Sequence, residues 1–243
     1  MTPETGQTMT EHTVRSYDQE LALLTTIIAR MGGLAEAQLA AAVQALGKRD
    51  TELGTRVVAA DARLDELERE VQQLTVRMLA LRQPVASDLR HIIAALKISN
   101  EIERIGDYAA NVAKRALVLN QMPAVEPVGA ILHLARLVQE IIKDVFDAYI
   151  ERDIQKAIQV WIRDEEVDAM YTSLFRELVT YMMEDPRTIT ACSHLMFMAK
   201  NIERIGDHAT NIAEILHFGV VGTALKGSRP KGNDLDAQAG GES

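Results

Sequence analysis

The sequence predicts an all-α protein made of two tandem, internally repeated antiparallel three-helix bundles, with six long helices in all. Hydrophobic residues make up 47% of the chain but aromatic residues only 4%, and apolar positions recur at three-four spacing. Residues 102–113 also return at 202–213. The first six positions of this segment are identical in the two copies, and three of the next six match as well. Agreement at a fixed offset indicates a tandem duplication.

The duplication divides the chain into four expected parts. A loose polar amino terminus is expected at residues 1–15, and the first bundle at 16–121. Two prolines make residues 122–127 a rigid, irregular connection between the halves. The second bundle is then expected at 128–218, and a tail without periodicity, expected to be disordered, at 219–243.

Capping residues and prolines predict where the helices start. Ser16 opens a capping box for the first helix, which is expected to end near Gly47. Asp50 and Asp153 are the expected N-caps of the second and fifth helices. Pro84 marks the start of the third helix, because proline is tolerated in a first turn but not in a helix interior. Asp-Pro at residues 185–186 opens the sixth helix in the same way. At 1.5 Å per residue, helices of about thirty residues span roughly 45 Å.

Glycines occur inside three of these predicted helices. Gly32 and Gly33 lie in the first helix, and Gly106 and Gly206 lie in the two copies of the repeated segment. A glycine in mid-helix costs about 1 kcal/mol relative to alanine. These positions therefore favour close approach of a neighbouring helix.

Composition and charge exclude several classes of function. The net charge of −9 argues against direct binding of nucleic acid, which requires clustered Lys and Arg. Cys192 is the only cysteine and lies in an apolar stripe, so we expect a small core residue. Neither a secretory leader nor an apolar run of membrane-spanning length is visible, and the cytoplasm is the expected location. Because the sequence has no nucleophile-base pair, phosphate-binding loop or kinase signature, we expect no enzymatic activity.

The second and third helices of each half carry acids four residues apart. This spacing places both carboxylates on one helix face, and in an antiparallel pair the middles of the two helices face each other. Each half should therefore bring two acid pairs together, where a cation would turn their repulsion into attraction. Oxygen-only ligands suit Mg²⁺, Mn²⁺ or iron better than zinc, which remains a further candidate. The predicted metal ligands are Asp61, Asp65, Glu103, Asp107, Asp164, Asp168, Glu203 and Asp207.

The alternative to metal binding is that these acids are solvated side chains on exposed helix faces. Acid pairs at this spacing are common on such helices, and Arg104, Arg163 and Arg204 lie close enough in sequence to neutralise their neighbours. Recurrence at four equivalent places, together with the mid-helix glycines, favours the metal-binding interpretation.

Three motifs together resemble the PhoU family, the accessory regulators of bacterial phosphate-specific transport. They are the twice-written Glu-Arg-Ile-Gly-Asp, the run Arg-Gln-Pro-Val-Ala-Ser-Asp-Leu-Arg at residues 82–90, and Thr-Tyr-Met-Met-Glu-Asp at residues 180–185. The resemblance covers about residues 10–218, and the family's acid-x-x-x-Asp metal motif falls on the eight acids named above. In the second half, Pro-Arg-Thr-Ile at residues 186–189 replaces the Asp-Leu-Arg cluster. Any role for Asp88 and Arg90 in binding an anion or a partner is then confined to the first bundle.

The resemblance implies a regulator that restrains the phosphate-starvation response. It implies a homodimer that links the ATPase subunit of the phosphate ABC transporter to a phosphate-sensing histidine kinase, and that meets the membrane only through these partners. Two alternatives stay open. One is a carboxylate-bridged, ferritin-like metal enzyme, which would need Glu-x-x-His pairs that the chain lacks. The other is a purely structural helical scaffold whose acids keep a surface soluble.

Overall fold

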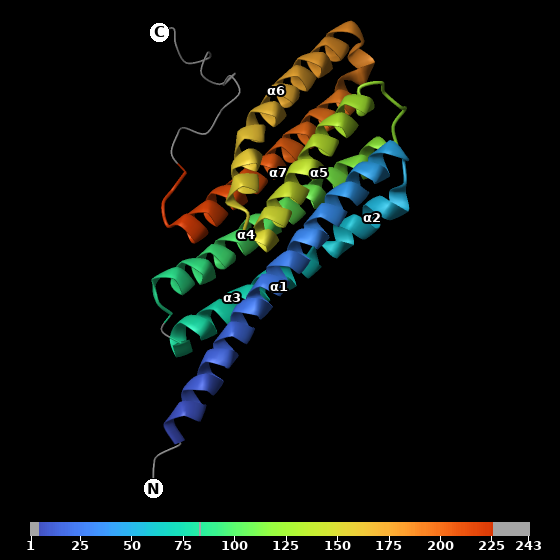
Figure 1. Cartoon of the computed structure of the whole chain (residues 1–243). Helices are drawn as coiled ribbons and strands as arrows, with labels where there is room; N and C mark the ends of the chain where they lie inside the picture. The colour runs from blue at the N-terminus through green and yellow to red at the C-terminus, as the bar shows by residue number, and fades with distance from the viewer. Residues whose placement is uncertain (1–4, 83, 226–243) are drawn as a thin grey trace, which may run out of the picture.

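The computed structural model describes residues 5–82 and 84–225, and every regular element in them is helical. This confirms the predicted all-α class and the two tandem bundles (Figure 1). None of the helices in these two ranges is both long enough and apolar enough to cross a membrane. The elements are α1 (Thr5–Gly47), α2 (Thr51–Ala60), α3 (Ala62–Arg82), α4 (Ala86–Leu119), α5 (Val128–Glu151), α6 (Ile154–Glu184), the 3₁₀ turn η1 (Pro186–Thr188) and α7 (Ile189–Val221).

The predicted caps form where aspartate precedes a helix. Asp50 accepts a hydrogen bond from Leu53 N at 2.9 Å, and Asp153 accepts one from Gln155 N at 2.9 Å. Asp185 accepts one from Arg187 N at 3.0 Å, although a turn of 3₁₀ helix then precedes α7. Each carboxylate satisfies a backbone N–H group that has no partner within its own helix.

Two helix boundaries differ from those expected. Helix α1 begins at Thr5 rather than Ser16, because no proline interrupts the intervening residues. Helix α7 continues to Val221 and ends at Gly222, whose φ of +83° suits glycine. The rest of the predicted tail, residues 226–243, lies outside the described residues, as do residues 1–4 and Gln83 of the 82–90 run.

The predicted second helix is also wrong in one respect, because it is divided at Asp61. Leu64 N donates to Asp61 O at 2.9 Å, a bond over three residues where an α-helix has four. Aspartate is a weak helix former, because its side chain competes for nearby backbone groups. The division therefore falls on one of the predicted metal ligands.

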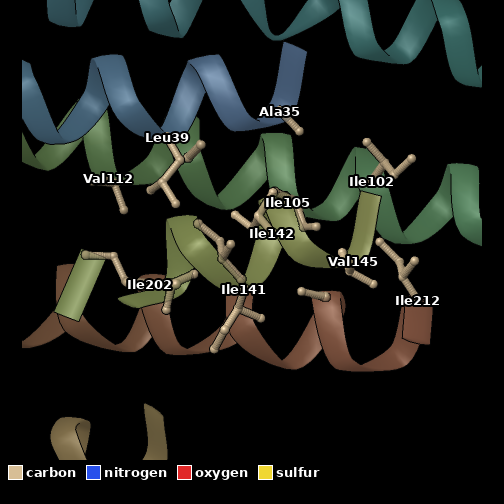
Figure 2. Close-up of a cluster of buried hydrophobic side chains, with 14 of the residues drawn as sticks. Ala35, Leu39, Ile102, Ile105, Val112, Ile141, Ile142, Val145, Ile202 and Ile212 are labelled. Atoms are coloured by element: carbon tan, nitrogen blue, oxygen red, sulfur yellow. The ribbon is translucent and has the colours of Figure 1, made fainter. Parts of the chain in front are cut away.

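The two bundles lie side by side and share one hydrophobic core. Helix α4 packs along α7, and α1 packs against α5, so each half contacts the other over two helix pairs (Figure 1). Figure 2 shows apolar side chains from both halves meeting in a single cluster. The labelled members are Ala35, Leu39, Ile102, Ile105, Val112, Ile141, Ile142, Val145, Ile202 and Ile212. Cys192 is fully buried in this core, as its apolar stripe predicts.

Polar side chains join α4 to α7 along the contact between the halves. His208 Nδ1 lies 2.7 Å from Glu101 Oε2, and Asn211 Nδ2 donates to the same oxygen at 3.0 Å. Burial alone would raise the pKa of Glu101, but the hydrogen bonds from His208 and Asn211 outweigh it and hold the pKa below its ordinary value. The rings of Tyr108 and His208, which occupy equivalent positions in the two repeats, stack with centroids 5.5 Å apart.

Candidate metal centre

The first candidate centre lies where α3 crosses the middle of α4. Gly106 permits this approach, because a Cβ atom there would collide with Leu64 Cδ1. The same hypothetical atom would lie 3.5 Å from Asp61 Oδ1, so the carboxylate of Asp61 rests against the glycine of the repeated segment. The local reason for the acid pairs to meet is therefore the absence of a side chain at position 106.

Each of the four predicted acids of the first half lies within electrostatic range of two others of the set. Burial raises the pKa of Glu103 to about 7, with the charge of Asp107 adding to the effect, Arg104 opposing it, and Glu68 and Asp65 raising it further. Burial also raises the pKa of Asp61, again with contributions from Asp107 and Asp65. These carboxylates repel one another, as two acid pairs facing across adjacent helices should.

Arg104 neutralises part of this charge, as the solvation alternative expects. Its Nε lies 3.6 Å from Glu103 Oε2, and its Nη1 lies 3.5 Å from Asp107 Oδ2. The Arg104 side chain is 54% exposed, however, and exposed ion pairs contribute little to stability. Glu103 keeps its raised pKa despite this neighbour.

The second candidate centre, between α6 and α7, is more deeply buried than the first. Asp164 is 3% exposed and accepts a hydrogen bond from Thr210 Oγ1 at 3.1 Å. Glu203 is 8% exposed, and its Oε1 accepts a hydrogen bond from Lys200 Nζ at 2.7 Å. Its other oxygen, Oε2, is buried and has no hydrogen-bond partner among the described residues. A buried carboxylate oxygen without a donor is costly, and a cation would satisfy it.

The charges of the second centre repeat those of the first. Burial raises the pKa of Glu203, and the hydrogen bond from Lys200 opposes that rise. The charges of Asp207 and Asp168 raise the pKa further, so these acids also lie within range of Glu203. Asp168 and Asp207 thus lie around Glu203 as Asp65 and Asp107 lie around Glu103.

Lys200 and Thr210 were not predicted from the sequence, whereas Arg163 and Arg204 do lie within range of neighbouring acids, as the solvation alternative expects. Thr210 stands where the first copy of the repeat has Ala110. This difference between the copies is the sequence signal that could have identified Thr210. Arg204 donates to the Tyr108 hydroxyl at 3.2 Å, and this hydrogen bond and the charges of Glu203 and Asp207 raise the pKa of Arg204. Arg163 pairs with Asp144 at 2.9 Å and with other acids outside the predicted set.

The donor chemistry fits a hard cation, but the side chains are not arranged around one. Every predicted ligand is a carboxylate, which suits Mg²⁺, Mn²⁺ or iron. Among the described residues, no three Asp, Glu, His or Cys side chains converge closely enough to ligate a single ion. Ligation therefore requires rotation of the Asp and Glu side chains on a backbone that already places them near one another.

The raised pKa of Glu103 predicts a pH dependence of stability in the absence of metal. The folded pKa of about 7 lies above the ordinary value of 4.5, so the folded state holds more protons than the unfolded state between these pH values. Stability should therefore fall as pH rises through this window. The Glu103 side chain is 19% exposed, and after allowance for screening we expect a loss of about 1–2 kcal/mol.

Urea unfolding in chelator between pH 5 and pH 8 measures this loss. The Glu103→Gln variant should match the native protein near pH 5 and exceed it by the expected amount near pH 8. Parallel stability curves for the two proteins over the whole range would show that Glu103 carries no such charge penalty.

Fold and site together define a class of protein: all-helical tandem bundles in which acid pairs meet across neighbouring helices of each half. A family model described as "PhoU domain" matches residues 28–116 and again residues 131–216. The chain belongs to the PhoU family.

Curated relatives support this membership over nearly the whole length of the chain. The phosphate-specific transport system accessory protein PhoU homolog of Caulobacter vibrioides is 57% identical over 224 residues, covering 92% of this chain and 97% of that protein. The homolog of Zymomonas mobilis is 46% identical over 94% of this chain and 96% of its own length.

Solved structures agree with the sequence comparisons. The crystal structure of PhoU from Pseudomonas aeruginosa matches with a TM-score of 0.83 at 40% identity, over 85% of this chain and all of that one. The phosphate transport system regulatory protein PhoU from Streptococcus pneumoniae matches with a TM-score of 0.80 at 26% identity, over 86% of this chain and 99% of that one. The chain is thus a regulatory protein with a role in phosphate transport. It is not an enzyme, which removes the ferritin-like alternative.

Proposed function

We propose that this chain is a cytoplasmic adaptor that restrains the phosphate-starvation response when phosphate is plentiful. In this proposal one surface binds the ATPase subunit of the phosphate transporter and another binds the phosphate-sensing histidine kinase. The chain acts as a homodimer and reaches the membrane only through these partners. The names of the relatives, accessory proteins of phosphate-specific transport, support the transporter as the first partner.

One observation carries the adaptor role: the two bundles share a continuous core. A partner bound to one half is therefore coupled through packed side chains to a partner bound to the other, as a regulatory link requires. Both halves also expose apolar side chains suited to protein contacts. Val76 on α3 is 66% exposed, and Met183 on α6 is 80% exposed.

Metal binding is the second part of the proposal. The eight acids would hold divalent or trivalent ions, with iron, Mn²⁺ and Mg²⁺ favoured and zinc a further candidate. The raised pKa of Glu103 and the unpartnered Oε2 of Glu203 support a cation at each centre. The ion would remove the repulsion between facing acid pairs and hold the second and third helices of each half together.

Co-purification with the transporter ATPase and the kinase, at high and at low phosphate, tests the adaptor role. We expect the native chain to retain both partners when phosphate is high. Val76→Ser and Met183→Ser place matched changes on the two halves, and each should weaken capture of one partner while leaving the other bound. Failure of the native chain to capture either protein would contradict the adaptor function.

A further inference from the structure

A basic cavity lies at one end of the contact between α4 and α7. Its volume is about 360 Å³, and helices of both halves line it. The polar and aromatic lining comes from Asn111, Lys114 and Arg115 on α4 and from His194, Phe197 and Asn201 on α7. Among the residues that the structure describes, none that lines this cavity is acidic.

Uncharged side chains of the cavity lining contact both of its cations. Arg115 Nη1 lies 3.1 Å from His194 Nδ1, and its guanidinium carbon lies 4.3 Å from the centre of the Phe197 ring. Lys114 Nζ donates to Asn111 Oδ1 at 3.3 Å. Stacking and hydrogen bonding thus fix the positive charge and leave it available to an anion.

His194 completes the set of donors. Burial lowers the pKa of His194, and the charge of Arg115 lowers it further, so the ring is neutral near pH 7. The neutral ring accepts from Arg115 at Nδ1 and therefore carries its proton on Nε2. Arginine, lysine, histidine and amide N–H groups are the donors that bind phosphate oxygens.

The repeat-related cavity at the other end of the contact between α4 and α7 is acidic rather than basic. There the duplication places Glu214, Ile215 and Glu101 where the basic end has Lys114, Arg115 and Asn201. These residues line a larger cavity of about 790 Å³, to which Glu68 adds another carboxylate. Two cavities related by the repeat therefore carry opposite charge, and only the first suits an anion.

We propose that the cavity between Arg115 and His194 is a binding site for a phosphate group, with inorganic phosphate as its ligand. A phosphate held there contacts α4 of the first half and α7 of the second. Its binding therefore stabilises the contact that joins the two bundles. The charge of Lys114 opposes the rise in the pKa of Asp61, so the anion site lies within electrostatic range of the first acid centre. The inference goes beyond the adaptor function, because it requires neither the transporter nor the kinase.

Isothermal titration of the full chain at constant ionic strength tests the site directly. Inorganic phosphate should bind to the native protein, and the Arg115→Gln and Lys114→Gln variants should each bind it about tenfold or more weakly. Arg56→Gln removes an equal charge from exposed helix α2 and should bind phosphate as the native protein does. Thermal unfolding of each variant verifies that the chain is folded.

Parallel titrations with ATP and with sulfate identify the source of the anion. Binding of ATP that is lost in Arg115→Gln would support the site and assign it to a nucleotide phosphate. Equal affinity for sulfate and phosphate, absence of phosphate binding at millimolar concentration, or unchanged binding by both cavity variants would overturn the proposal. Capture of the partner proteins is measured separately, so failure of this site is distinguishable from failure of the adaptor function.

Discussion

A double variant, Glu103→Gln with Asp107→Asn, is expected to be more stable than the native protein in chelator and to lose its stabilisation by Mn²⁺ at the first centre. Removal of the two charges relieves repulsion at a site where burial and Asp107 raise the pKa of Glu103 to about 7. We expect a gain of about 1–2 kcal/mol in the metal-free state at pH 8. For the native protein, a metal ion at a hundred times its dissociation constant adds about 2.7 kcal/mol.

Thermal unfolding with and without Mn²⁺ measures both effects. For a chain of this length, the metal term corresponds to a rise in Tm of about 5–10 °C in the native protein. The matched control is Glu70→Gln with Glu177→Gln, which removes two exposed charges outside the acid centres. This control should keep the native response to Mn²⁺. An undiminished response in the Glu103 and Asp107 variant would contradict the ligand assignment.

Gly32→Ala is expected to destabilise the protein by about 1–3 kcal/mol, whereas Gly33→Ala should stabilise it. A Cβ atom at Gly32 would lie 2.8 Å from two atoms of the Phe146 ring and 2.9 Å from a third, where α1 packs against α5. The rigid, buried ring cannot move aside without disturbing the shared core, and overpacking of this kind costs about 1–3 kcal/mol. Gly33 is exposed, and no neighbouring atom lies within 4 Å of its hypothetical Cβ.

The neighbouring glycine provides an internal control for helix propensity. Alanine at position 33 should gain about 0.5–1 kcal/mol, because it restricts the unfolded chain and suits the helix. Urea unfolding of the two variants compares them at equal composition. Similar changes in the free energy of unfolding at positions 32 and 33 would show that α1 and α5 are not packed as closely as the structure places them.

Helices, caps and the pairing of acid positions were predictable, because each depends on residues close together in the chain. Asp50 and Asp153 cap the helices that they precede, and the three-four periodicity marks the buried faces. The acid spacing also predicted that acids of the second and third helices would approach each other, since antiparallel helices align at their middles. In agreement, Asp107 raises the pKa of Asp61, and Asp65 raises the pKa of Glu103.

Contacts between the halves were not predictable from local spacing. The hydrogen bonds to Glu101 from His208 and Asn211, and the approach of Arg115 to His194, join residues more than seventy positions apart. The break at Asp61 was also not predictable from apolar spacing, because an unbroken apolar seam predicts a single helix. The spacing carries no information on the Asp61 side chain, which competes with the helix for backbone hydrogen bonds. Mismatches between the repeats, such as Arg115 against Ile215, are the sequence signal that marks these positions.

Metal content of the chain purified without chelator most directly tests whether the repeated acids hold ions. Elemental analysis of the native protein should find bound metal, and Glu103→Gln with Asp107→Asn should lose the share held by the first half. Glu203→Gln with Asp207→Asn should lose the share held by the second half, and the two variants combined should lose all of it. A native protein without metal, or the same stoichiometry in all four proteins, would contradict the assignment of these acids as ligands.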